Sequence, residues 1–227
     1  MIFTLPSQMS RDPPQYGTSV RSLLSAIEED RKDLFKLGRS LMGQSGDPFF
    51  PVDLFALGAL KRSVSTAAAM IMMVEARNMV CARTLLRTHL DTSLRFSAAW
   101  LVEKPHEFAT EVLRGDRIDR MKGRDGKKLT DAHLVATHSG EIPWLPEVYA
   151  RLSGYVHFSG SHIFDSVSNL EEDGLLEFVV TAEDLKFPDA SWIEVLECFR
   201  AATAILVRYL DGYRVTKRMS PEDLEAS

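Results

Sequence analysis

The fold is predicted from residues 52–103, which read VDLFALGALKRSVSTAAAMIMMVEARNMVCARTLLRTHLDTSLRFSAAWLVE. This segment contains one glycine, Gly58, and no proline, and it is rich in Ala, Leu, Met, Arg and Glu, which favour the α-helix. A single helix of that length does not fit a compact domain, and asparagine can cap either end of a helix. We therefore expect a break near Arg77 and Asn78, with two long antiparallel helices on either side of it.

Apolar residues at helical spacing continue on both sides of this segment. The further predicted helices are Thr18–Leu41, capped by Thr18 or Ser19; His106–Met121; a short piece near Thr130–Thr137; Glu147–Phe158; and a last helix from Asp189 or Ser191 to about Lys217. After Gly160 the apolar residues alternate, which predicts a small β-hairpin at about residues 161–181 with its turn at Glu171–Gly174. The sequence thus predicts a mainly α protein, an up-and-down helical bundle with long antiparallel helices plus a small β-hairpin.

The chain of 227 residues is expected to form one helical domain, residues 18–218, with an N-terminal extension at 1–17 and a frayed tail at 219–227. Its hydrophobic fraction of 45% and charged fraction of 26% are typical of a globular protein and exclude wholesale disorder. The extension lacks signal-peptide features and Ala67–Val74 is flanked by charges, so we expect no membrane contact and a cytoplasmic location. Cys81 and Cys198 lie far apart and are expected to be buried reduced thiols.

One side of the predicted third helix carries Arg83, Arg87, Asp91 and Arg95, each four residues after the last. One interpretation is a solvated ladder of ion pairs, each contributing a few tenths of a kcal/mol. The other is that the bundle interior or an interface takes in Arg87 and Asp91, where a paired charge can orient a catalytic group or a phosphate.

A second polar group lies in residues 149–162, which read YARLSGYVHFSGSH and contain Arg151, His157 and His162. A histidine that titrates near neutrality can act as general base and acid. An arginine fork can bind phosphate oxygens and stabilise charge in the transition state. Metal-independent RNA cleavage needs these two functions. Alternatively, His157 is a helix-end histidine bonded to a carbonyl, or it joins His162 and Asp165 as a metal ligand.

Arg151, followed by five residues and then His157, resembles the Arg-x(4–6)-His motif of the HEPN superfamily, α-helical proteins that include ribonuclease toxins and members without known activity. The resemblance covers roughly residues 52–161, about half of the chain. It implies a site composed across a two-fold homodimer, in which His157 activates a ribose 2′-hydroxyl and Arg151 holds the scissile phosphate. Arg87, Asp91 and His162 would support that site. Catalytic members commonly carry a polar residue after the arginine, whereas this chain has Leu152 there.

Between residues 114 and 128 seven basic residues face three acidic ones, a local excess in a chain of net charge −5. The segment is interpreted either as a solvated helix end and loop or as a contact to an RNA backbone. The candidate nucleic-acid-binding residues are Arg114, Arg117, Arg120, Lys122 and Arg124. The overall negative charge argues against a protein that coats nucleic acid through bulk electrostatics.

The chain contains no Gly-rich phosphate loop, G-x-S-x-G, H-E-x-x-H or C-x-x-C, so we expect no cofactor and no metal. The sequence favours a HEPN-like, non-catalytic module that binds a small ligand or a protein partner such as an antitoxin, and forms a homodimer. The alternative is a metal-independent ribonuclease of the toxin or phage-defence type that uses the Arg151 and His157 pair. A third interpretation is an unrelated enzyme that uses the same His, Asp and Arg side chains.

Overall fold

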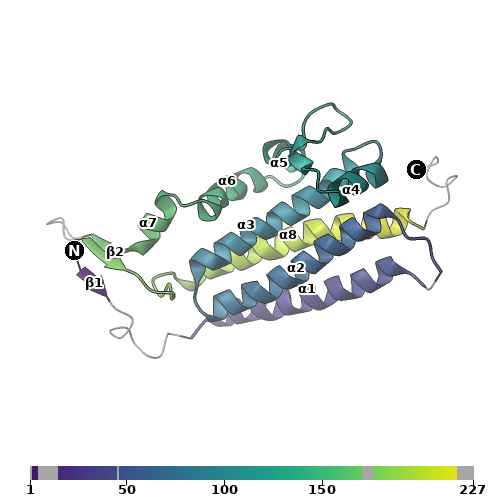
Figure 1. Ribbon diagram of the computed structural model, residues 1–227. Helices are drawn as coiled ribbons and strands as arrows, with labels where there is room; N and C mark the ends of the chain where they lie inside the picture. The colour runs from purple at the N-terminus through teal and green to yellow at the C-terminus, as the bar shows by residue number, and fades with distance from the viewer. Residues whose placement is uncertain (1, 5–14, 45, 171–175, 219–227) are drawn as a thin grey trace.

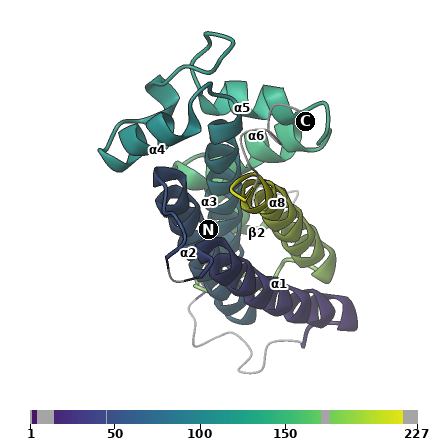
Figure 2. The same cartoon turned by 90° about the vertical axis from the view of Figure 1, so that its right-hand side faces the viewer.

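The computed structural model describes residues 2–4, 15–44, 46–170 and 176–218. Within them, long helices pack side by side as a bundle (Figures 1 and 2). These helices are α1 (Thr18–Met42), α2 (Pro51–Glu75), α3 (Met79–Ser97) and α8 (Asp189–Thr216). Both α1 and α3 contact α2 and α8, which gives the order α1, α2, α3, α8 around the bundle. The predicted mainly α bundle is confirmed.

The chain reverses direction at each pass through the molecule. The backbone nitrogen of Gly17 lies 2.7 Å from Asp189 Oδ2, so α1 and α8 begin at the same end. The backbone nitrogen of Met79 lies 2.7 Å from Asp184 Oδ2, so α3 also begins there. Between α3 and α8 the chain returns along the outside of α3 in short helices, and α6 (Leu145–Val156) of this return packs on α3 (Figure 1). That return pass carries most of the candidate residues.

The predicted break between α2 and α3 lies at Arg77 and Asn78. Arg77 adopts a left-handed backbone with φ of 52°, a conformation that is uncommon for a residue other than glycine. Its guanidinium lies over the Tyr16 ring, 4.0 Å from the ring centroid. Asn78 caps α3, because its Oδ1 accepts a hydrogen bond from the Cys81 backbone nitrogen at 2.9 Å. The sequence signal at this break is therefore confirmed.

The core follows from the apolar spacing of the long helices. In α1 a buried residue recurs every seven positions, at Val20, Ile27, Leu34 and Leu41. The leucines Leu86, Leu90 and Leu94 of α3 face the same interior, where α8 contributes the large side chains of Trp192 and Phe199. This interior leaves the opposite side of α3, with its arginines, to meet the return pass.

Several predicted boundaries were wrong for identifiable reasons. Gly17 stands at the N-cap of α1 in place of Thr18 or Ser19. The predicted helix at 106–121 ends early, because α4 spans Pro105–Leu113 and Gly115 turns the chain with φ of 100°. The remaining elements on this side are η2 (Ala98–Trp100), η3 (Ile118–Arg120), α5 (Asp131–His138) and α6 (Leu145–Val156).

The predicted hairpin begins later than expected. Residues Gly160–Ser166 form the short helix α7, because the Ser159 hydroxyl accepts a hydrogen bond from the Ser161 backbone nitrogen and caps it. Strand β2 (Val167–Leu170) then pairs antiparallel with β3 (Leu176–Val179), and β1 (Ile2–Thr4) pairs parallel with β3. The predicted turn at 171–174 and the tail at 219–227 lie outside the described residues.

By length and composition, α2 is the one helix of the described chain that could cross a membrane, with a mean hydropathy of 1.3 in its most apolar window. Of that window 39% is buried inside the bundle. The core helix of a soluble protein passes the same test, so the absence of a membrane segment and the cytoplasmic location stay predictions.

Candidate functional site

The arginine stripe of α3 lies in the interface with α5 and α6. The guanidinium carbon of Arg87 lies 3.7 Å from the centroid of the Tyr149 ring, and Arg87 also donates to the Tyr149 hydroxyl. Arg87 Nη2 lies 3.4 Å from Asp131 Oδ2 on α5, and its side chain is only 12% exposed. Arg87 therefore holds two elements of the return pass against α3.

Asp91 and Arg95 complete this group, which we call the α3 polar cluster: Arg87, Asp91, Arg95, Asp131 and Tyr149. Asp91 accepts a hydrogen bond from Arg95 Nε at 2.8 Å, and Arg95 also reaches Asp131. Burial, with Asp131 beside the hydroxyl, raises the pKa of Tyr149, so this phenol keeps its proton at neutral pH. The sequence allows two interpretations of the stripe, a solvated ladder of ion pairs or a part of the bundle interior or an interface. Arg87 and Asp91 lie in the interface between α3 and the helices α5 and α6.

A second arginine and tyrosine pair lies one turn earlier on α3. The Arg83 guanidinium carbon lies 4.8 Å from the ring centroids of both Tyr155 and Phe187, and Arg83 Nη1 lies 3.2 Å from Asp165 on α7. The sequence reasoning missed Tyr149 and Tyr155 as partners of the stripe. The sequence did contain an arginine stripe on one predicted helix and two tyrosines on another. The spacing of residues along the chain does not show which helices contact each other, so the pairing could not be predicted.

The structure does not bring Arg151 and His157 together. The Arg151 side chain is 65% exposed, and its Nη atoms lie 2.8 Å from Glu147 and 3.6 Å from Glu194 of α8. His157 stands at the C-cap of α6 and is exposed. Among the described residues it makes no hydrogen bond or ion pair, so the predicted carbonyl bond of a helix-end histidine is not observed.

His162 has a structural position at the start of α7. Its Nδ1 accepts a hydrogen bond from the Ser159 backbone nitrogen at 3.3 Å, and its ring lies 5.8 Å from that of Phe158. Asp165 is engaged by Arg83 instead. Within the described part of the chain no group of three or more His, Cys, Asp or Glu side chains could hold a metal ion, so the alternative metal site with His157 is not assembled.

A small pocket of about 240 Å³ separates α6 from α8, and Arg151 is one of its lining residues. Arg83, Tyr155 and Glu194 also line it, whereas His157 does not. The Cys198 thiol lies at this pocket, and burial raises its pKa, which disfavours the reactive thiolate. The expectation that Cys81 is buried was wrong, because this residue lies at the exposed start of α3.

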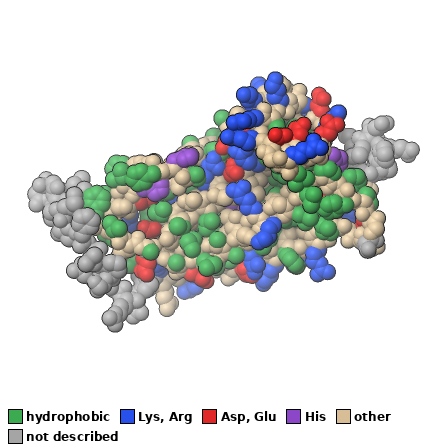
Figure 3. Space-filling model, viewed as in Figure 1, with side chains coloured by type: hydrophobic (Ala, Val, Ile, Leu, Met, Phe, Trp, Pro, Cys, Tyr) green, Lys and Arg blue, Asp and Glu red, His purple; other side chains and the backbone are tan. Residues whose placement is uncertain are grey.

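The basic segment is exposed, as a solvated loop or an RNA contact would require. Its five candidates, Arg114, Arg117, Arg120, Lys122 and Arg124, are all exposed. Figure 3 shows blue side chains over the part of the molecule that projects above α3, with red ones among them. Arg117 pairs with Asp119, for example. This mixture of charges weakens the case for a continuous phosphate-binding track.

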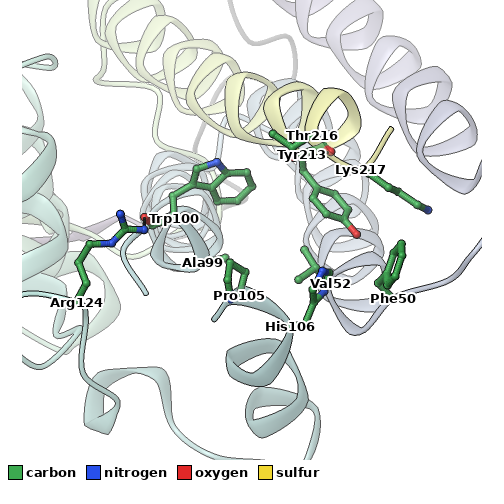
Figure 4. Close-up of a pocket in the computed structure, with 10 residues that line it drawn as sticks. All are labelled: Phe50, Val52, Ala99, Trp100, Pro105, His106, Arg124, Tyr213, Thr216 and Lys217. Carbon is green, nitrogen blue, oxygen red and sulfur yellow. Dashed lines mark hydrogen bonds between the residues drawn. The ribbon is translucent and has the colours of Figure 1, made fainter. Parts of the chain in front are cut away.

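Arg124 differs from the other basic residues because it belongs to a pocket. Its Nη2 donates to the backbone oxygens of Trp100 at 2.9 Å and Val102 at 3.0 Å. Arg124 lines a pocket of about 400 Å³ at the end of the bundle, which we call the end pocket (Figure 4). Its walls come from the start of α2, η2, the start of α4, the loop at Arg124 and the end of α8.

Apolar and aromatic side chains make the walls of the end pocket. Val52 and Ala99 are buried, and Trp100 and Tyr213 stand on either side of the space in Figure 4. Lys217 also lines the pocket, and its Nζ lies 2.8 Å from Asp53 Oδ1. The side chains of this pair are 8% and 2% exposed. The sequence reasoning did not identify this pocket, because its lining residues come from five separate segments.

Comparisons with protein-family models, with curated proteins and with solved structures find no match to this chain. The resemblance to the HEPN superfamily therefore stays a prediction.

Proposed function

We propose that the protein is a non-catalytic helical module that acts by binding a ligand. The observation that carries the proposal is that the pocket beside Arg151 does not include His157, while a pocket of about 400 Å³ lies at the other end of the bundle. Pockets of this size with apolar walls and a few polar groups are typical small-molecule sites.

The charges of the predicted catalytic site already have protein partners. A group that stabilises a phosphate in the transition state must be free to contact it. Arg87 is engaged by Tyr149 and Asp131, and Arg151 by Glu147 and Glu194. These contacts support a structural role for Arg87 and give Arg151 a place in a surface ion pair.

Leu152 supports the same proposal. It follows Arg151 directly and is only 6% exposed. It is one of the two buried residues of α6 and packs into the hydrophobic core. A polar residue there would be buried without a partner at a cost of about 1–3 kcal/mol. The apolar side chain at this position is therefore explained by packing of α6 on the bundle.

The test is RNA cleavage in the presence of a chelator. Total RNA is incubated with the wild type, His157→Ala and Arg151→Ala, with His106→Ala as a control for an exposed histidine distant in sequence. We expect no cleavage that depends on His157. Metal-independent cleavage by the wild type that His157→Ala abolishes, with helicity and melting temperature unchanged, would overturn the proposal and support the ribonuclease. Such a ribonuclease would need a second copy of the chain to bring Arg151 and His157 together.

A further inference from the structure

We propose that the end pocket binds a small aromatic carboxylate, with the carboxylate at Arg124 and the planar body between Trp100 and Tyr213. This inference rests on the proposed binding function and names the chemical class of the ligand. Three features carry it: a guanidinium without a carboxylate partner, aromatic side chains held in place by their neighbours, and a pocket lining that contains no acidic side chain among the described residues.

The free charge is that of Arg124. Its Nη2 is held by two backbone oxygens near the end of η2, but it has no ion pair among the residues described. Carbonyl oxygens orient the guanidinium without cancelling its charge, and the remaining donors stay available for an anion. A carboxylate accepts two hydrogen bonds from such a fork, which favours a planar oxyanion over a single neutral acceptor.

The walls are fixed before a ligand binds. The Trp100 ring packs edge to face against the rings of Phe96 and Tyr209, at centroid distances of 5.4 and 5.2 Å. The Tyr213 hydroxyl donates to Asp53 Oδ1 at 3.1 Å. Because these rings are already ordered, a planar ligand loses little free energy in arranging them. The aromatic side chains of Trp100 and Tyr213 that line the space favour an aromatic ligand body.

The other charged groups leave room for a negative ligand. Asp53 is engaged by Lys217 at 2.8 Å and by the backbone nitrogen of Phe50 at 2.7 Å, so its charge is compensated inside the protein. Glu107, next to the lining residue His106, is paired with Lys104. Both α2 and α4 begin beside the pocket, and the positive ends of their dipoles add to the attraction of an anion.

The experiment measures binding of 2-naphthoate and of the neutral 2-naphthamide by isothermal titration calorimetry. We expect naphthoate to bind about tenfold more tightly than naphthamide, as a charge-assisted hydrogen bond of about 1.4 kcal/mol predicts. Arg124→Gln should weaken naphthoate binding about tenfold and leave naphthamide binding unchanged. Arg120→Gln, an exposed arginine that does not line the pocket, is the matched control and should change neither.

A second variant fills the space without altering the core. Thr216 lines the pocket from an exposed position on α8, and Thr216→Trp should block both naphthalene compounds while the melting temperature is retained. No naphthoate binding by the wild type, or binding that survives Arg124→Gln and Thr216→Trp, would overturn the ligand assignment. Those results do not involve His157, so the RNA assay still decides the proposed function separately.

Discussion

The α3 polar cluster lies along α3, and the end pocket lies just after the end of that helix. The arginines of the two sites have opposite roles. In the cluster, Arg87 and Arg95 face carboxylates and a tyrosine, so their charge is used inside the protein. In the end pocket, the hydrogen-bond partners of Arg124 within the described chain are backbone oxygens. An arginine is therefore a candidate for ligand binding when its charge has no carboxylate partner in the protein. Exposure or a place in a sequence motif does not by itself identify such an arginine.

The largest expected effect is at the buried ion pair of Asp53 with Lys217, which lines the end pocket. Asp53→Ala would leave the buried Lys217 ammonium without a counter-charge and would remove a cap from α2, so we expect a loss of about 3–5 kcal/mol in the free energy of unfolding. Urea denaturation measures it. The matched control is Asp211→Ala, which removes a more exposed ion pair with Arg214 and should cost less than about 1 kcal/mol. Similar losses in the two variants would show that Asp53 and Lys217 are not a tightly coupled pair.

A smaller effect is expected in the polar cluster. Arg87→Ala removes the contact with Tyr149 and leaves Asp131 with less compensation, so we expect a loss of about 2 kcal/mol and faster amide hydrogen exchange in α6. Arg151→Ala is the matched control on α6 itself. Its side chain is 65% exposed, so the change should stay within about 0.5 kcal/mol. Unchanged exchange in α6 after loss of Arg87 would mean that apolar packing alone holds the return pass.

The free energy of unfolding is also expected to depend on pH, because His89 is buried on the inner face of α3. The His89 ring stacks on the Phe199 ring at a centroid distance of 4.2 Å. Burial is the main cause that lowers the pKa of His89 from 6.5 to about 3, and the positive charge of Arg62 acts in the same direction. Between these values the unfolded chain binds a proton that the folded chain does not bind. The contribution of His89 to stability is therefore full above pH 6.5 and decreases as the pH falls toward 3, by up to about 1.4 kcal/mol per pH unit.

Denaturation at a series of pH values checks this slope. His89→Gln should flatten it, whereas the exposed histidine variant His106→Gln should keep the slope of the wild type. An equal slope in all three proteins would assign the pH dependence to other groups.

The smallest expected effect is that of Arg124 on stability. Arg124→Gln removes hydrogen bonds from an exposed side chain to two backbone oxygens, so the free energy of unfolding should fall by less than about 1 kcal/mol. Urea denaturation of this variant beside Arg87→Ala sharpens the comparison directly. A loss as large as that of Arg87→Ala would make Arg124 a structural residue like those of the polar cluster.

Patterns within one helix predicted much of the fold. The apolar residues of α1 recur at a period that keeps them on one face, and the break at Asn78 is a local capping signal. Errors arose where neighbouring residues decide the structure. Ser159 caps α7 where alternating apolar residues favoured a strand, and Gly115 ends the regular structure that the apolar stripe after α4 predicted to continue.

The candidate site was harder to predict because it depends on which elements meet. The sequence placed Arg87 and Asp91 on one stripe, but the Arg87 partners Tyr149 and Asp131 lie 62 and 44 residues from Arg87 in the chain. Arg151 and His157 are close in sequence, yet a helical rotation of about 100° per residue places them on different faces of α6. Whether such residues share a function depends on the side chains opposite them, which no local pattern contains.

By itself, the sequence determined that this chain forms long amphipathic helices, where they break, and which of their faces is apolar. Those properties depend on backbone propensities and on spacing over one or two turns. Only the tertiary structure decided that the return pass lies against the arginine stripe and that segments from residues 50 to 217 enclose a pocket. Packing brings some charged side chains against a partner of opposite charge and leaves others without one. Which of these occurs depends on residues that are distant in sequence and adjacent in the folded protein.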